Sequence, residues 1–311
     1  MANGPVTSFA VPNYSGMLYT KSNTNTPFLN MIGATRYTNH VEFAISQEYE
    51  LETPGQPAIS ETASLTAPTA THATRTPHSN VTQIFHRAVE VSYAKMSNMG
   101  TMSGPNVAGQ QPNPRDELDF QISVQMQNIA NSIEYTFLNG VYQKADSDSA
   151  ANKTRGILTA ITTNAIAGGE AALTKAMLRS LFKSIYDNGG RVNGAIILVN
   201  SFQKGAISDL YANGMSTPAS RTVAGINVTD IVTDFGNVGV ALAPSMPQGS
   251  LLIFNPEVCH AIEQPTPGKG NFFYEELAKT GAGERGQIFG QIGLDYGPEW
   301  MHGKITGLAT E

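Results

Sequence analysis

Two long stretches of alternating apolar and polar residues, 37–49 and 81–93, constrain the fold of this 311-residue chain most strongly. An alternation with a period of two is typical of a β-strand that is buried on one face only. At about 3.3 Å per residue, the first stretch alone would span roughly 40 Å, which is long for a strand in a compact domain. The residues between them, 52–80, are polar and rich in Thr, Pro, Ala and Ser. The large apolar side chains share one face: Tyr37, Val41, Phe43, Ile45, Tyr49, Val81, Phe85, Val89, Val91 and Tyr93.

This pattern predicts one long two-stranded ribbon over residues 37–96, with an extended tip. Isolated two-stranded ribbons are only marginally stable in water. We therefore expect the ribbon to pack on a neighbouring copy of the chain through its apolar face. Four of its side chains are predicted to make these contacts between subunits: Phe43, Ile45, Phe85 and Val89.

The first 36 residues indicate an extended arm. They carry only two charged side chains, Lys21 and Arg36, and their apolar residues follow no period. Such a segment buries too little surface to offset the entropy lost when it becomes ordered. We expect the arm, residues 1–36, to lie across another subunit.

The strongest helix signal follows a linker rich in Gly, Pro and Asn, residues 97–113. Asn113 is a preferred N-cap residue, Pro114 suits the first helical position, and two acidic residues follow in the first turn. The apolar residues beyond them predict a helix over about 114–143, roughly 45 Å long at 1.5 Å per residue. Their 3.6-residue period and lightly charged flanks favour a helix that lies on a sheet over a coiled coil. The apolar stripe consists of Leu118, Ile122, Met126, Ile129, Ile133, Phe137 and Val141.

The rest of the chain predicts an α/β unit followed by further strands. Within residues 160–265, Thr174 is the predicted cap of a helix that ends before Gly189, and an apolar strand and a hairpin follow. A short strand is predicted at Ile157, Leu158 and Ile161. Residues 266–311 return to strand-like alternation, with one apolar face formed by Ile288, Ile292, Leu294 and Tyr296.

The composition favours a protein that is largely covered by copies of itself. Charged residues make up only 14% of the chain, and interface cores are depleted in charge. The net charge of −6 argues against a protein that coats DNA, which needs clustered Lys and Arg. The single cysteine, Cys259, cannot form a disulfide within the chain and is predicted to be a small core residue. No apolar run approaches the roughly 20 residues of a membrane-spanning helix.

No pattern predicts catalytic, cofactor-binding or metal-binding residues. Residues 281–286 match G-x-G-x-x-G, but a dinucleotide fingerprint must open a helix. The residues after this match alternate like a strand, so a turn is predicted here. The six histidines show no ligand spacing, and His72 and His78 fall in the polar ribbon tip.

Short motifs near the C-terminus give the chain a resemblance to a known family. They are Glu284-Arg285-Gly286-Gln287-Ile288, then Gly290 and Tyr296, and finally His302 to Leu308. Together with the turn at Arg155-Gly156-Ile157-Leu158 and the order of the elements, they resemble a tailed-bacteriophage major capsid protein with the Hong Kong ninety-seven type fold. The resemblance implies an α+β fold divided into an arm (1–36), an extended loop (37–96), a peripheral domain with a long spine helix (97–159), an axial domain (160–265) and a return to the peripheral domain (266–311).

The resemblance also implies a function. Pentamers and hexamers would assemble into an icosahedral virion shell that encloses double-stranded DNA without sequence-specific binding, in the host cytoplasm. The implied partners are a portal protein and, on some shells, a decoration or cement protein. Because no charged helical segment precedes the arm, a separate scaffolding protein is expected. Two other readings are an encapsulin-type compartment, which shares the fold, and an α/β oxidoreductase.

Overall fold

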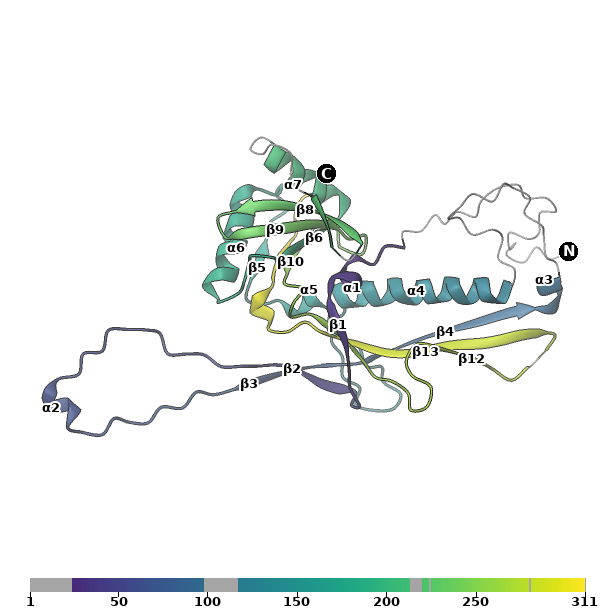
Figure 1. Cartoon of the computed structure of the whole chain (residues 1–311), viewed down its shortest axis with the longest axis horizontal. Coiled ribbons are helices and arrows are strands. Elements are labelled where there is room, and N and C mark those ends of the chain that lie inside the picture. Colours follow the sequence, from purple (N-terminus) through teal and green to yellow (C-terminus); the bar gives the residue numbers. More distant parts are fainter. Residues whose placement is uncertain (1–23, 98–116, 213–219, 224, 280, 311) are drawn as a thin grey trace.

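The computed structural model describes residues 24–97, 117–212, 220–223, 225–279 and 281–310. It consists of two β-sheets with their helices and a ribbon that projects far from both (Figure 1). The first sheet has five strands, β1 (Gly33–Tyr37), β11 (His260–Glu263), β13 (Gly283–Asp295), β12 (Phe273–Glu276) and β4 (Gln83–Ser92). The long strand β13 pairs with three of the others, which makes it the centre of this sheet.

Helix α4 (Glu117–Asn139) lies along one face of the five-stranded sheet. It buries Ile129, Ile133 and Phe137 against the alternate residues of β4 and β13. The predicted spine helix is therefore confirmed, and it ends at Asn139 rather than near residue 143. Gly140 follows, and its backbone lies so close to Gly156 that a Cβ at either position would clash. The predicted cap at Asn113 lies outside the described residues.

The second sheet has seven strands and is covered by two helices, α6 (Lys175–Asp187) and α7 (Ser201–Ala212). The hydroxyl of Thr174 accepts a hydrogen bond from the amide of Met177, which confirms the predicted cap of α6. The predicted hairpin is also confirmed. The strands, in their order across the sheet, are β5 (Ala165–Ala167), β14 (Gly303–Thr306), β10 (Leu251–Phe254), β6 (Ile196–Val199), β9 (Gly236–Leu242), β8 (Ile226–Thr233) and β7 (Ser220–Val223).

Strands β6 and β10 join the two parts of the molecule because both of their faces are buried. Ile197 and Ile253 pack under α6 and α7, whereas Leu198 and Phe254 belong to the core that α4 covers. Continuous apolar runs are typical of strands with two buried faces.

The ribbon is shorter than predicted, and its second strand differs. Strand β2 (Glu42–Glu48) pairs with β3 (Thr76–Val81), and the short helix α2 (Glu61–Ser64) lies at the tip. Most of the predicted second strand is β4, which pairs with β13 over ten positions from Gln83 to Ser92. An alternating pattern predicts which face of a strand is buried, but it does not predict the neighbouring strand. In the folded chain, β4 pairs with the central strand β13.

Three further predictions are corrected. Residues Ile157–Ala160 form a helical turn, α5, that packs under the end of α4, so the predicted strand there is wrong. The end of the predicted arm is part of this chain's own core, because α1 (Pro27–Met31) packs on α4 and β1 pairs with β11. Residues 303–306 form β14 and join the seven-stranded sheet instead of returning to the first. The remaining described helices are α3 (Tyr93–Ser97) and the 3-10 helix Glu299–Met301.

Candidate intersubunit surfaces

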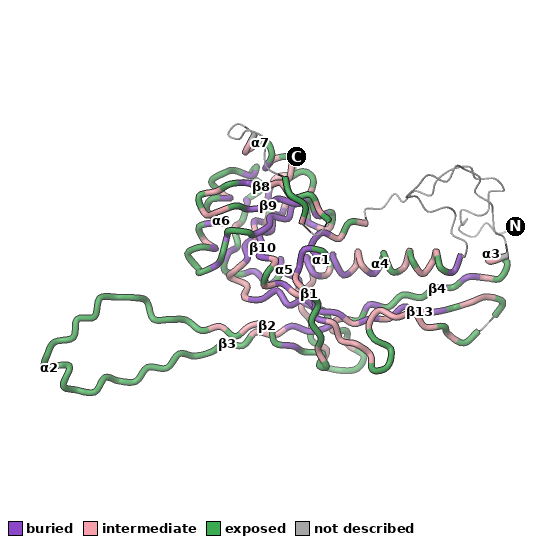
Figure 2. The backbone as a smooth tube through the Cα atoms, in the orientation of Figure 1, coloured by how far each residue is buried: buried purple, intermediate pink, exposed green. Residues whose placement is uncertain are grey.

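The tip of the ribbon makes no buried contact with its own chain. Every residue from Tyr49 to Pro77 is exposed, as the continuous green tube in Figure 2 shows. Leu51, Ile59 and Leu65 are 82%, 72% and 86% exposed. Large exposed apolar side chains that gather on one segment indicate a surface for a partner. The tip is nonetheless locally ordered, since the Ser60 hydroxyl accepts a hydrogen bond from the Ala63 amide at the start of α2.

The root of the ribbon, in contrast, is anchored firmly. Asn80 is fully buried, and its side chain donates to the Leu294 carbonyl at 2.8 Å and accepts from the Arg155 amide at 2.8 Å. The Phe43 ring lies over Gly293, where an added Cβ would stand 2.7 Å from its Cε1 atom. Both contacts join the ribbon to β13, so its direction is fixed where it leaves the body.

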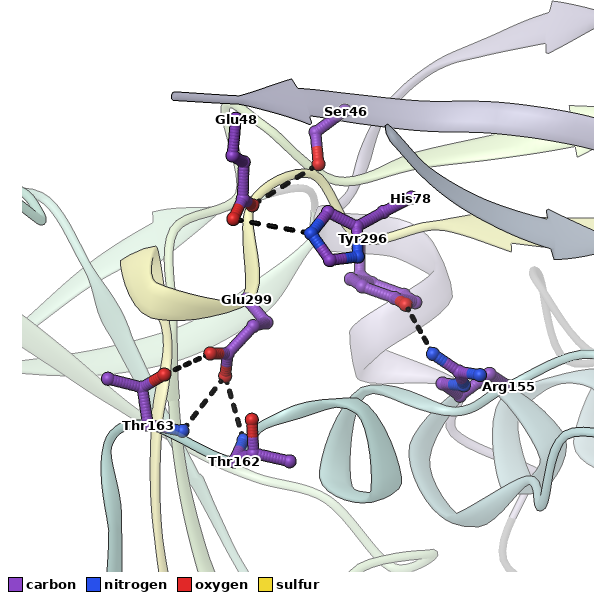
Figure 3. A network of polar contacts seen from close by, with 8 residues as sticks. All are labelled: Ser46, Glu48, His78, Arg155, Thr162, Thr163, Tyr296 and Glu299. Atoms are coloured by element: carbon purple, nitrogen blue, oxygen red, sulfur yellow. Dashed lines mark hydrogen bonds and ion pairs between the residues drawn. The ribbon is translucent and has the colours of Figure 1, made fainter. Parts of the chain in front are cut away.

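Charged groups surround this root. The Glu48 carboxylate accepts a hydrogen bond from Ser46 at 3.3 Å and pairs with His78 on the opposite strand at 3.4 Å (Figure 3). Lys144 pairs with Glu42 at 2.5 Å, and this hydrogen bond lowers the pKa of the Glu42 carboxyl. These pairs are partly exposed, and such pairs usually contribute below about 1 kcal/mol.

Glu299 makes the denser polar contacts in the same view. Its carboxylate accepts from the amides of Thr162 and Thr163 at 2.7 and 3.2 Å and from the Thr163 hydroxyl (Figure 3). Burial would raise the pKa of Glu299, but these hydrogen bonds outweigh it and hold the pKa below its usual value. The Tyr296 hydroxyl accepts from Arg155 at 3.4 Å. All these bonds are within the chain, and those of Glu299 join the 3-10 helix to the segment after α5.

The five-stranded sheet has a second face, opposite α4, that carries a row of aromatic rings. Phe289 lies between His86 and Phe273, with ring centroids 6.2 and 6.0 Å apart. The Lys269 ammonium lies 5.3 Å from the centroid of the Phe273 ring. The neighbours of these residues along β4 and β13, such as Ile288, point into the core under α4, so the row must point away from it. Ile84, on the same face, is 57% exposed.

The four residues predicted to contact another subunit lie near the root and on the first sheet. Phe43, Phe85 and Val89 are buried in this chain's own core, and Ile45 is half-buried against it. Their contact with a neighbouring copy stays a prediction. Sequence reasoning missed the row on the opposite face. His86 follows Phe85 on the polar side of the alternation, and Phe289 pairs with His86 from β13.

The residues considered for metal and cofactor chemistry can be placed in the described part of the chain. No group of three or more His, Cys, Asp and Glu side chains that could hold a metal ion is found there. The turn predicted over residues 281–286 is wrong for most of its length, because strand β13 already begins at Gly283 and pairs with β4 there. The strand predicted after the match is confirmed. Cys259 is fully buried, and burial raises the pKa of its thiol. Among the described residues, no helix is both long and apolar enough to cross a membrane.

Comparison with known proteins gives one family and one fold. The family model described as SU10 major capsid protein matches residues 2–309. A search of curated protein sequences gives no match. Among solved structures, the cyanophage A-1(L) capsid has a TM-score of 0.66 at 12% identity, covering 94% of this chain and 95% of that one.

Two further solved structures share the fold. The capsid of Myoviridae phage XM1 has a TM-score of 0.61 at 12% identity and covers 99% of this chain and 100% of its own. The SrpI encapsulin of Synechococcus elongatus PCC 7942 has a TM-score of 0.64 at 10% identity, and the match covers 96% of this chain and 92% of the encapsulin chain. At such identities the likeness shows the fold alone.

Proposed function

Because the chain belongs to the SU10 major capsid protein family and is therefore a major capsid protein of a tailed bacteriophage, we propose how its copies hold the shell together. The ribbon tip of one copy, residues 49–77, lies on the open face of the five-stranded sheet of the next. This proposal rests on one observation: the described chain has a long segment with no buried residue, and on one face of its sheet Ile84 is 57% exposed while Phe273 and Phe289 are only partly buried.

The two surfaces match in length and chemistry. At roughly 3.3 Å per residue, each half of the tip can extend about 40 Å from the root, enough to cross a sheet whose central strand has 13 residues. Between residues 53 and 74 the only charged side chain is Glu61, and the sheet face presents Ile84, Phe289 and Phe273. Burying a large apolar side chain contributes roughly 1.5–3 kcal/mol, and many such contacts per copy make the closed shell durable.

The copies are proposed to gather as pentamers and hexamers into an icosahedral virion shell, with the axial domain at the centre of each ring. The role is structural and non-enzymatic. The net charge of −6 suits a container that encloses double-stranded DNA without binding its sequence. A portal protein, a separate scaffolding protein and a decoration or cement protein are the proposed partners, with assembly in the host cytoplasm.

The proposed contact can be tested by photo-crosslinking. Leu65 is replaced by a benzoylphenylalanine, and shells assembled from a mixture of isotope-labelled and unlabelled chains are irradiated. We expect adducts between different copies, on β4, β12 or β13. The same substitution at Asn128, exposed on α4, is the control and should give no adducts on these strands. Adducts of position 65 on its own chain, or on the outer side of α4, would contradict the proposal.

The encapsulin reading remains the alternative because an encapsulin shares the fold. The family match favours the capsid. The two predict different contents: shells of a capsid protein filled in infected cells enclose double-stranded DNA, and an encapsulin encloses a protein cargo. Mass spectrometry and nuclease-protected DNA measured on purified particles decide between them.

A further inference from the structure

Helix α1 is capped by a side chain from a distant part of the chain. Pro27 occupies its first turn and has no N–H, and the side chain of Thr26 makes no capping hydrogen bond. Instead, the carboxylate of Glu134 on α4 accepts from the Phe28 amide at 2.9 Å and from the Leu29 amide at 2.8 Å. The free donors at the start of a helix need such partners. One spine-helix residue thus holds the point where the arm joins the body.

The capped turn also connects α4 with the second sheet. Phe28 is fully buried, and its ring packs on Phe254 of β10 with centroids 5.0 Å apart. Met31 is buried in the same cluster. Removal of α1 would therefore uncover Phe254 as well as Glu134.

Glu134 is fully buried and forms no ion pair among the described residues. A buried carboxylate without a cation is costly unless its hydrogen bonds are strong or it is protonated. Burial raises the pKa of Glu134 to about 7, against the opposing effect of the two backbone hydrogen bonds. The acid therefore titrates near neutral pH.

No charged group near Glu134 raises its pKa, and burial is the cause of the increase. Helix α1, which Glu134 caps, helix α5, which packs on α4, and strand β10, on which Phe28 packs, carry no ionizable side chain. Tyr135, the next residue on α4, is 60% exposed. On the sheet below α4, the charged residues on the helix side are Arg87, Glu263, Glu276 and Glu284. None of these groups contributes to the pKa shift of Glu134.

We propose that Glu134 is a proton-dependent latch that fastens the arm to the spine helix and loosens it when the carboxyl ionises. With α1 docked, Glu134 is shielded from water, so the docked state favours the protonated acid. With α1 released, the carboxyl meets water and ionises at its ordinary pKa of 4.5. Docking is therefore strongest below pH 4.5, weakens as pH rises toward 7 and is constant above it. That the released arm then lies across a neighbouring copy rests on the proposed function, in which copies of the chain assemble into a shell.

Hydrogen exchange of the full-length chain tests the latch. After correction for intrinsic exchange rates, we expect protection of the Phe28 and Leu29 amides to fall between pH 5 and pH 7, by up to about ten-fold per pH unit, and then to level off. E134Q cannot ionise and should make the profile flat. E117Q, which removes another buried acid from the same helix, should leave the wild-type profile unchanged.

Two outcomes would overturn the latch: a wild-type profile that is flat between pH 5 and 7, or a wild-type slope retained in E134Q. If E134Q fails to fold, E134M is a second neutral variant, and the wild-type profile decides by itself. Because the exchange is measured at the α1 amides of one chain, it reports the latch even if no shell forms. Failure of the proposed function would appear instead in the crosslinking of the ribbon tip.

Discussion

The side chain of Asn80 forms two hydrogen bonds with the backbone of Arg155, accepting from its amide at 2.8 Å and donating to its carbonyl at 3.2 Å. The same side chain donates to Leu294 on β13. A residue at the root of the ribbon thus fixes the segment after α4 and the central strand of the first sheet. Because Asn80 holds the root at these points, the ribbon leaves the body in a defined direction. It does so although the tip makes no buried contact with its own chain.

Replacing Asn80 should destabilise the whole subunit. N80A leaves the Arg155 amide and the Leu294 carbonyl without their partner in a buried site, and each such loss costs roughly 1–3 kcal/mol. We expect the free energy of unfolding in urea to fall by about 2–4 kcal/mol. N128A removes an exposed asparagine of α4 and should change it by less than about 0.5 kcal/mol. Equal effects of the two substitutions would contradict the anchoring role.

The close approach of Phe43 to Gly293 makes a second, independent prediction. In G293A the new Cβ would stand 2.7 Å from the Phe43 ring and 2.9 Å from the Val81 carbonyl oxygen. Overpacking of this kind typically costs about 1–3 kcal/mol, so a lower melting temperature is expected. G281A is the matched control, because a Cβ at Gly281 meets nothing within 4 Å. A melting temperature of G293A equal to that of G281A would refute the contact.

His302 should make the subunit sensitive to acid. The ring is fully buried, Nε2 lies 2.6 Å from the Tyr296 carbonyl, and Nδ1 accepts from the Asn255 amide at 3.3 Å, so an added proton would break a bond. Burial lowers its pKa from 6.5 to about 4. The unfolded chain then binds more protons between these values, and stability present above pH 6.5 is lost as pH falls toward 4, by roughly 3 kcal/mol at most.

Urea unfolding at a series of pH values measures this loss. H302Q should be less stable at neutral pH but should lose less stability between pH 6.5 and 4 than the wild type. Glu134 acts in the opposite direction, because its raised pKa gives stability at low pH that fades as pH rises toward 7. The experiment is therefore best made with E134Q as the background. An unchanged slope in H302Q would show that other groups cause the acid sensitivity.

A charge at the ribbon tip should prevent assembly without harming the subunit. Leu65 is 86% exposed, so L65D should alter the free energy of unfolding by less than about 0.5 kcal/mol. It would nonetheless place a carboxylate against the aromatic row of the next copy, and we expect far fewer closed shells by sedimentation and electron microscopy. T71D adds the same charge to the same loop without removing an apolar side chain and should assemble better. Wild-type assembly of L65D would contradict the proposed contact.

Much of the architecture could be predicted from the chain because local patterns are sufficient for it. The apolar stripe from Leu118 to Phe137 predicts α4, Thr174 predicts the start of α6, and the alternation from Ile288 to Tyr296 predicts β13 with its buried face. These features depend on the period of the residues and on caps, which act over a few positions. The short run at Ile157 was misjudged because helix and strand cannot be distinguished over so few apolar residues.

The sequence by itself determined which side of each strand and helix is apolar, that the chain is poor in charge, and that residues 52–80 form a polar stretch. Only the tertiary structure decided that β4 pairs with β13 instead of β2, that Glu134 caps α1 across a separation of 106 residues, and that His86, Phe289 and Phe273 form one row. The physical reason is that periodicity is a local property of the backbone, whereas the choice of a partner depends on which surfaces the whole folded chain leaves uncovered.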